Sequence, residues 1–82
     1  MKQREVLLFA IASDLAGCDR LAIDIPQNAS VNDVMLAIGV ACPALSDWLP
    51  CCRLAVGQSF AAPGDSVSDD AEIALIPPVS GG

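Results

Sequence analysis

The amino-acid sequence predicts an α+β fold, in which a mixed β-sheet wraps over one main helix. Three segments lead to this expectation: an apolar run at residues 6–12, a capped helical pattern at residues 31–41, and a last segment at residues 72–76 that is apolar after Glu72. The two runs suit buried strands of one sheet, and the helical pattern suits the element that covers them. With 82 residues, the chain can form one domain with a single modest core.

The first two strands are expected at residues 6–12 and 20–25. The earlier run is continuously apolar and begins with a β-branched residue, which predicts a strand buried on both faces in the middle of the sheet. The later run alternates, which is typical of a half-exposed strand. Its apolar side consists of Leu21, Ile23 and Ile25. Turn residues separate the two runs, so we expect a hairpin around Gly17.

The main helix is expected at residues 31–41. Ser30 is a favourable N-cap, and Asp33 lies three residues later, where its carboxylate can accept a hydrogen bond from the backbone N–H of the cap. This carboxylate also suits the positive end of the helix dipole. Apolar residues recur at helical spacing at Val31, Val34, Met35, Ile38 and Cys42. Pro43 cannot continue the helix and should end it.

A short helical turn should follow the main helix and cap the core. Leu45, Trp48 and Leu49 have helical spacing within residues 43–50. Trp48 is expected to act as a lid at the end of the core, which is a more ordinary role for a single Trp than stacking on a ligand.

The remaining segments predict a hairpin and a final strand. Strands at residues 52–56 and 59–62 should be joined by a turn at Gly57. The last strand, residues 72–76, should pair in parallel with the first at the centre of the sheet. Two strands, a helix, a hairpin and a final strand in one small domain correspond to a β-grasp fold.

Composition limits the classes of partner. The net charge is −6, and the only cations are Lys2, Arg4, Arg20 and Arg53, which argues against nucleic acid as a ligand. The acidity favours a partner with a basic surface, or it only aids solubility. Hydrophobic residues make up 54% of the chain, so part of the apolar surface is expected to dock on a partner. The apolar runs are too short to span a bilayer or to form a secretory signal, so we expect a cytoplasmic protein.

Four cysteines, Cys18, Cys42, Cys51 and Cys52, are expected to be reduced. Their spacings do not match a zinc site, and the chain has no histidine. We therefore predict no metal site and interpret the cysteines as small, buried or half-buried thiols of a reducing compartment. The less favoured alternative is that a cysteine relays sulfur.

The C-terminal segment, residues 77–82, is predicted to be an extended and flexible tail that follows a domain at residues 1–76. Pro77 and Pro78 fix φ and lack an N–H group, so the strand should stop there. Gly81 and Gly82 make the end of the chain thin enough to thread into a narrow active site of another protein. The alternative is an idle terminus.

Residues 73–82, with the sequence IALIPPVSGG, resemble the end of the small, sulfur-carrying subunit of molybdopterin synthase. Residues 6–10, followed by Leu15, Ala16 and Gly17, are similar to the first strand and turn of that ubiquitin-like β-grasp family. Members often carry an Arg-Glu pair where this chain has Ser13 and Asp14. A polar contact of that pair with the partner is therefore not expected.

The resemblance implies a role in molybdenum cofactor biosynthesis. A ubiquitin-activating-like adenylyltransferase would use ATP to adenylate Gly82, and sulfur would then be loaded as a thiocarboxylate. The large, catalytic subunit of molybdopterin synthase would accept the tail, and two carriers would supply the two sulfurs of the molybdopterin dithiolene. The sequence holds no P-loop, histidine or Ser/His/Asp set, so we expect a non-catalytic subunit that binds no cofactor itself.

Two groups of residues are expected to carry this function. Gly82 is the reacting residue, and Gly81 lets the tail fit. The partner channel should be lined by Pro77, Pro78, Val79 and Ser80. Apolar residues on the exposed sheet face should dock the partner, with Phe9, Phe60 and Leu75 as candidates.

Three alternatives stay open from the sequence. The first is a carrier for thiamine or tRNA thiolation; such carriers also end in Gly-Gly but typically lack the Pro-Pro-Val-Ser lead-in. The second is a protein modifier whose tail is joined to lysines, although Lys2 is the only lysine for chains of the modifier itself. The third is a plain ubiquitin-like interaction domain with an idle tail.

Overall fold

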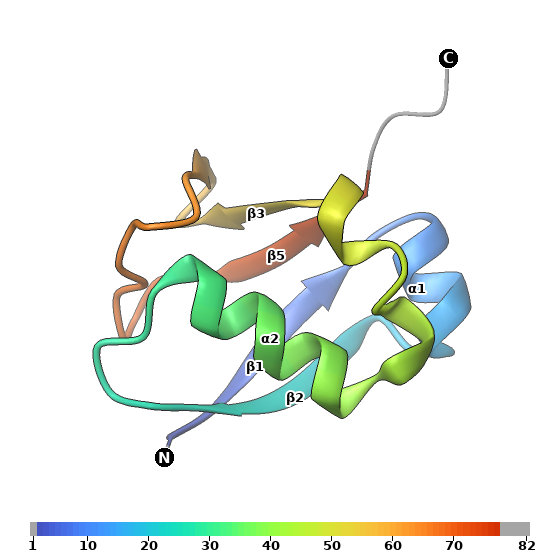
Figure 1. Cartoon of the computed structure of the whole chain (residues 1–82), viewed down its shortest axis with the longest axis horizontal. Coiled ribbons are helices and arrows are strands. Elements are labelled where there is room, and N and C mark those ends of the chain that lie inside the picture. Colours follow the sequence, from blue (N-terminus) through green and yellow to red (C-terminus); the bar gives the residue numbers. More distant parts are fainter. Residues whose placement is uncertain (1, 78–82) are drawn as a thin grey trace.

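The structure, a computed structural model, describes residues 2–77 and consists of one five-stranded sheet packed against one main helix (Figure 1). The strand order is β2-β1-β5-β3-β4. The strands are β1 (Lys2–Leu8), β2 (Arg20–Ile25), β3 (Arg53–Val56), β4 (Ser59–Ala61) and β5 (Ile73–Ile76). β1 and β5 are parallel, and the other neighbouring strands are antiparallel. The predicted mixed sheet with β5 at its centre is therefore confirmed.

β1 is an interior strand, as predicted, but it lies four residues earlier than expected. Its pairing with β2 runs from Lys2, opposite Ile25, to Leu7, opposite Arg20. The polar start of β1 joins the sheet because backbone hydrogen bonds to β2 do not require apolar side chains. The strand ends at Leu8, so the prediction of a strand over residues 6–12 is wrong at both ends.

The connection from β1 to β2 contains a short helix, α1 (Ile11–Ala16), which the sequence analysis missed. Ala10 turns the chain out of the sheet with a φ of 53°, and Gly17 ends α1 in the left-handed conformation. The strands are antiparallel, as a hairpin requires, but Gly17 caps a helix instead of forming a tight turn. A short apolar run fits a strand or a helix equally well, which explains the error.

The main helix, α2 (Val31–Ala41), has the predicted bounds. The Ser30 hydroxyl accepts a hydrogen bond from the backbone N–H of Asp33 at 3.2 Å, and the Asp33 carboxylate accepts one from the backbone N–H of Ser30 at 3.0 Å. This capping box satisfies N–H groups that have no partner within the helix. Pro43 begins the 3₁₀ turn η1 (Pro43–Leu45), and η2 (Leu49–Cys51) follows it.

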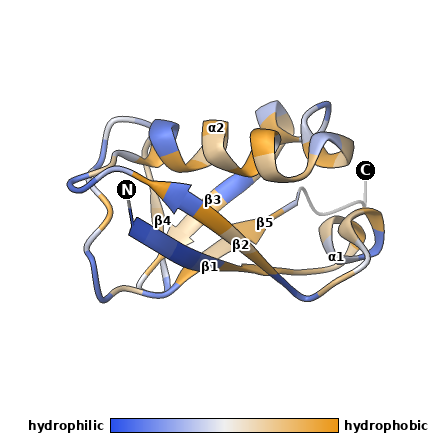
Figure 2. Cartoon of the chain, turned by 90° about the horizontal axis from the view of Figure 1, so that it is seen from below, coloured by the Kyte–Doolittle hydropathy of each residue, from blue (hydrophilic) through white to orange (hydrophobic). Residues whose placement is uncertain are grey.

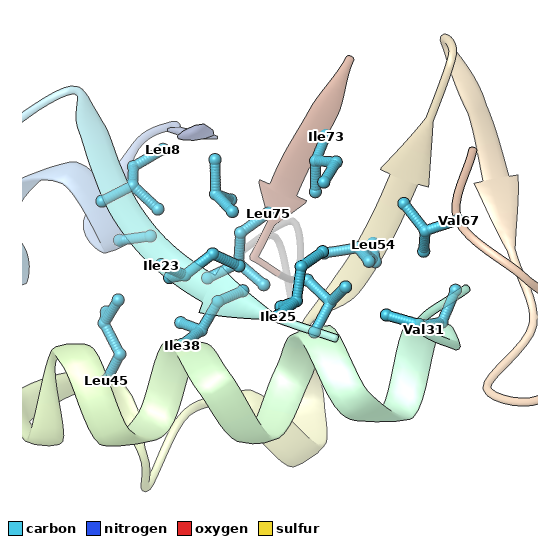
Figure 3. Packing of buried hydrophobic residues seen from close by; sticks show 14 residues of the cluster. Leu8, Ile23, Ile25, Val31, Ile38, Leu45, Leu54, Val67, Ile73 and Leu75 are labelled. Carbon is cyan, nitrogen blue, oxygen red and sulfur yellow. The ribbon is translucent and has the colours of Figure 1, made fainter. Parts of the chain in front are cut away.

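The core lies between α2 and the face of the sheet turned toward it (Figure 3). Val34 and Ile38 of α2 are 0% exposed, and so is Leu75 of β5. Leu45 of η1 closes one end of the core and is also 0% exposed, whereas Trp48 is 38% exposed and lies outside the core cluster. The prediction of a Trp48 lid is therefore wrong, because Leu45 occupies that position.

The β3–β4 hairpin has the predicted turn. Gly57 and Gln58 have φ values of 61° and 70°, the left-handed values at both central residues that suit the twist of a two-residue hairpin. Figure 2 shows α2 on one side of the sheet and α1 at its end. Within residues 2–77, no helix has the length and apolar character that crossing a membrane requires.

Candidate functional site

The candidate site is the sheet face that points away from α2, which we call the outer face. One row of paired residues crosses all five strands on this face. Leu7 of β1 pairs with Arg20 of β2 and with Ala74 of β5. Ala74 pairs with Ala55 of β3, which pairs with Phe60 of β4. The middle of the row has small side chains, so the outer face offers a flat apolar surface on which a partner could dock.

A cation lies at each end of the row. Arg20 forms an ion pair with Glu5, with 3.6 Å between Nη1 and Oε1. At the other end, the guanidinium of Arg53 lies 5.0 Å from the ring centroid of Phe60. Phe60 is 62% exposed, as the sequence analysis expected for a docking residue. The outer face therefore combines an apolar centre with polar ends, as in many protein–protein interfaces.

Leu75 was expected on the exposed sheet face, and this expectation is wrong. Leu75 is 0% exposed and packs in the core, because Ile73 and Leu75 share the face of β5 toward α2. The alternate residues, Ala74 and Ile76, point to the outer face. Ala74 and Leu7 are thus outer-face residues that the sequence analysis missed. No signal in the sequence distinguished Leu7, because its neighbours Val6 and Leu8 are also apolar. Only the structure shows that Val6 and Leu8 face α2 and that Leu7 therefore points to the outer face.

Phe9 extends the outer face toward the end of the chain. It follows β1 directly and is 48% exposed. Leu8, the residue before Phe9, pairs with Leu75, the residue before the last one of β5. Phe9 therefore lies near the end of β5, two residues before α1 begins, and Figure 1 shows α1 beside the end of β1.

Pro77 is the last described residue, and it is buried directly after β5. Its predicted contact with a partner channel stays a prediction. The other predicted tail residues, Pro78, Val79, Ser80, Gly81 and Gly82, lie outside the described residues. β1 and β3 flank β5 on both sides, so Pro77 directly follows a strand that is paired along both of its edges.

The adjacent cysteines that directly precede β3, Cys51 and Cys52, have different environments. Cys51 is exposed, whereas Cys52 packs against the core. Burial raises the pKa of the Cys52 thiol, and the neighbouring Cys51 raises it further. All four cysteines are free; Cys42 and Cys52 are half-buried as expected, but Cys18 and Cys51 are exposed, contrary to the prediction. Within residues 2–77, no three Cys, Asp or Glu side chains are grouped so as to hold a metal ion.

Comparison with known proteins identifies the family. Residues 6–82 match the ThiS family. The chain belongs to the ThiS family. The molybdopterin synthase sulfur carrier subunit of Chlamydomonas reinhardtii is 34% identical over 82 residues, which cover 98% of this chain and 99% of that relative. The protein of the same name from Caenorhabditis elegans is 39% identical over 80 residues, with 95% of both chains covered.

A solved structure supports the fold of this ThiS-family chain. SAMP1 from Haloferax volcanii superposes with a TM-score of 0.84 at 31% identity, covering 99% of this chain and 100% of that one. The predicted ubiquitin-like β-grasp fold and the resemblance to molybdopterin synthase sulfur carrier subunits are confirmed.

Proposed function

We propose that this chain is the sulfur carrier subunit of a molybdopterin synthase. The observation that carries the proposal is the similarity to sulfur carrier subunits of that enzyme over nearly the whole chain, together with a family match that runs through the terminal Gly82. The free cysteines are compatible with the reducing cytosol, where we place the protein.

Gly82 would be the reacting residue. A carboxylate is a poor acyl donor, so an adenylyltransferase related to ubiquitin-activating enzymes would join it to AMP at the expense of ATP, with release of pyrophosphate. A sulfur donor would then displace AMP and leave a thiocarboxylate on Gly82. The chain itself needs no bound cofactor for these steps, because ATP is bound and used by the activating partner.

The folded domain would position this reacting end. β5 is paired on both sides, and Pro77 is buried, so the root of the tail has a defined place and direction. The outer face would dock on the activating enzyme and, in turn, on the large subunit of the synthase. Phe60 and Phe9 are the most exposed apolar side chains beside this face and would contribute contact area. The tail would then enter the active site of the partner, and two loaded carriers would supply the dithiolene sulfurs.

A second candidate function is covalent protein modification. SAMP1, whose structure is so similar, is a small archaeal modifier protein. Activation of Gly82 would be the same in this case, but the acyl group would pass to a lysine amine of a target protein. Lys2 is the only lysine of this chain, so chains of the modifier could form only through that residue.

Intact-mass measurement separates these candidates. The chain is incubated with the adenylyltransferase, ATP and a sulfide source, and a mass increase equal to replacement of one oxygen by sulfur is expected. Deletion of Gly82 should abolish this increase, and Gly81→Ala should block it by steric exclusion while the fold is retained. Addition of the large subunit and the pterin precursor should then yield molybdopterin. Conjugates with lysine-containing proteins, without a thiocarboxylate, would instead favour the modifier, and no mass change would contradict both functions.

A further inference from the structure

A second apolar surface lies on the layer of the molecule opposite the outer face. It is a groove of about 820 Å³ between α2 and the start of the β3–β4 hairpin, which we call the α2 groove. One wall is formed by Met35, Leu36 and Val40 of α2, and Leu49 and Pro50 of η2 contribute to the floor. The groove shares little with the outer face, so a partner could occupy each at the same time.

The wall of the α2 groove is more apolar than the fold requires. Leu36 is 65% exposed and Val40 is 83% exposed, at i, i+4 spacing on one side of α2. The core of the domain uses the other side of this helix, where Val34 and Ile38 are fully buried. An i, i+4 pair of exposed aliphatic side chains along a groove is the arrangement that an amphipathic helix of a partner can pack against.

Two residues shape the groove for such a contact. A Cβ atom at Gly39 would lie only 3.2 Å from Cδ1 of Leu49, so glycine lets η2 approach α2 and form the floor. Met35 lines the groove and is half-buried, and its unbranched, polarizable side chain can adapt to an incoming surface. The close approach of Leu49 to Gly39 thus limits the depth of the groove, whereas the side chain of Met35 can change conformation when a partner binds.

The charge around the α2 groove is negative. The carboxylates nearest to groove residues in the sequence are those of Asp33 and Asp47, and no Lys or Arg occurs from residue 21 to residue 52. Asp33 and Asp47 are exposed, and each is adjacent in sequence to a residue that lines the groove. Complementary charge in a partner would accelerate association and orient it on this surface.

The cations of the domain have contacts elsewhere. Lys2 lies 3.4 Å from Asp69, Arg20 pairs with Glu5, and Arg4 donates to the backbone carbonyls of Ser68 and Ala71. Arg53 lines one end of the α2 groove, but its guanidinium lies over the Phe60 ring on the outer face. The groove therefore has an apolar floor, acidic surroundings and a single cation that is directed to the other face.

We propose that the α2 groove binds a cationic amphipathic helix of a partner protein. A second copy of this chain is a poorer occupant, because it has the same net charge of −6 and the same acidic surroundings at its groove. Since the groove and the outer face lie on opposite layers, the helix can stay bound while the outer face docks on another protein. The simultaneous occupancy rests on the proposed function, whereas binding of the helix does not.

Trp48 provides the measurement. It is the only Trp of a chain that has no Tyr, it is partly exposed, and it directly precedes η2 at the floor of the groove. The probe is a synthetic peptide of about 18 residues, or five helical turns, with Leu on one face and Lys on the other and no aromatic residue. A peptide with Glu in place of Lys and a peptide of the same composition in scrambled order serve as controls. We expect a saturable change in Trp48 fluorescence with the Leu/Lys peptide and no such change with either control peptide.

Matched variants test the site. The double variant Leu36→Ser, Val40→Ser should weaken binding of the Leu/Lys peptide at least about tenfold, because the anchoring side chains are lost. Asp47→Asn should weaken it about twofold at low salt and leave it unchanged at high salt, where charges are screened. Phe9→Ser, which leaves the charge unchanged at a residue outside the groove, should bind the peptide as tightly as the wild type. Equal affinity of the double variant and the wild type, or equal binding of the Glu peptide, would overturn the proposal.

Sulfur loading separates this proposal from the proposed function. The double variant should retain native circular dichroism and gain the sulfur mass at the wild-type rate, and the peptide should bind equally well to the chain in complex with the large synthase subunit. Loss of loading in a folded double variant would assign the groove to the activating enzyme and overturn the proposal. Sedimentation equilibrium gives the oligomeric state. A wild-type mass that rises to that of a dimer with increasing concentration, while the double variant stays monomeric, would identify a second copy as the occupant and overturn the proposal. Peptide binding without sulfur loading of any variant would contradict the proposed function alone.

Discussion

The two faces of the sheet differ although they are built from alternate residues of the same strands. Toward α2, β5 presents the large, fully buried Ile73 and Leu75, whereas its outer side presents Ala74 and Ile76. The paired strands repeat this division, with Leu54 inside and Ala55 outside in β3. Large branched side chains fill the core, and the small side chains of Ala74 and Ala55 keep the middle of the outer face flat. Stability and the proposed docking of a partner would therefore depend on neighbouring residues and should be separable by substitution.

The largest effect is expected for matched leucines on the two faces. Leu75→Ala removes a fully buried side chain and leaves a cavity, so it should lower the free energy of unfolding by about 3 kcal/mol. Leu7→Ala, in the adjacent strand on the outer face, should cost only about 1 kcal/mol because Leu7 is half-exposed. Urea denaturation followed through Trp48 fluorescence measures both values. Similar decreases in the free energy of unfolding for the two variants would mean that both faces of the sheet contribute equally to stability, contrary to this description.

The second comparison concerns recognition on the two layers. If the outer face docks the large synthase subunit as proposed, Phe60→Lys should weaken that binding about tenfold, since it replaces an exposed aromatic side chain with a charge. Val40→Lys introduces the same charge on the opposite layer, where the side chain is 83% exposed, and should leave this affinity unchanged. Isothermal titration calorimetry gives both dissociation constants. An equal loss in Val40→Lys would place the interface on α2 instead.

The third prediction concerns the point where the chain leaves both faces. Ala10 has φ 53° and ψ −127°, a conformation that strains any residue with a Cβ atom. Ala10→Gly should therefore raise the free energy of unfolding by about 1 kcal/mol, after the larger entropy of glycine in the unfolded chain is deducted. Ala44→Gly, in the 3₁₀ turn η1, is the matched control and should not stabilise the protein. Destabilisation by Ala10→Gly would show that the backbone there is unstrained.

The smallest effect concerns the adjacent cysteines. Cys51 is exposed to solvent, whereas Cys52 packs against the core. The thiolate is the reactive form, and burial raises the pKa of the Cys52 thiol, so iodoacetamide at pH 8 should modify exposed Cys51 before Cys52. A thiol with a raised pKa in the folded state stabilises the fold at pH values below its ordinary pKa. That contribution is lost as the pH rises through the folded-state value. Peptide mapping by mass spectrometry gives the order of alkylation, and faster reaction at Cys52 would contradict its burial.

The amino-acid sequence determined the features that depend on a few neighbouring residues. Ser30 and Asp33 form the predicted capping box, Pro43 follows the end of α2, and Gly57 forms the predicted hairpin turn. These signals act through hydrogen bonds and backbone angles within one helical turn or one β-turn, so they do not depend on the rest of the chain. The alternation at residues 20–25 likewise gave the inward face of β2 correctly, because one side is apolar and the other polar.

Only the tertiary structure decided which side of a uniformly apolar strand faces the core. β5 has no polar residue to distinguish its sides, so Leu75 was assigned to the wrong face until pairing with β1 and β3 fixed its orientation. The start of β1 and the existence of α1 were decided in the same way, by backbone pairing with β2 and by the turn at Ala10. The outer face and the α2 groove each combine residues that are distant in sequence, and a contact between distant segments has no local signal.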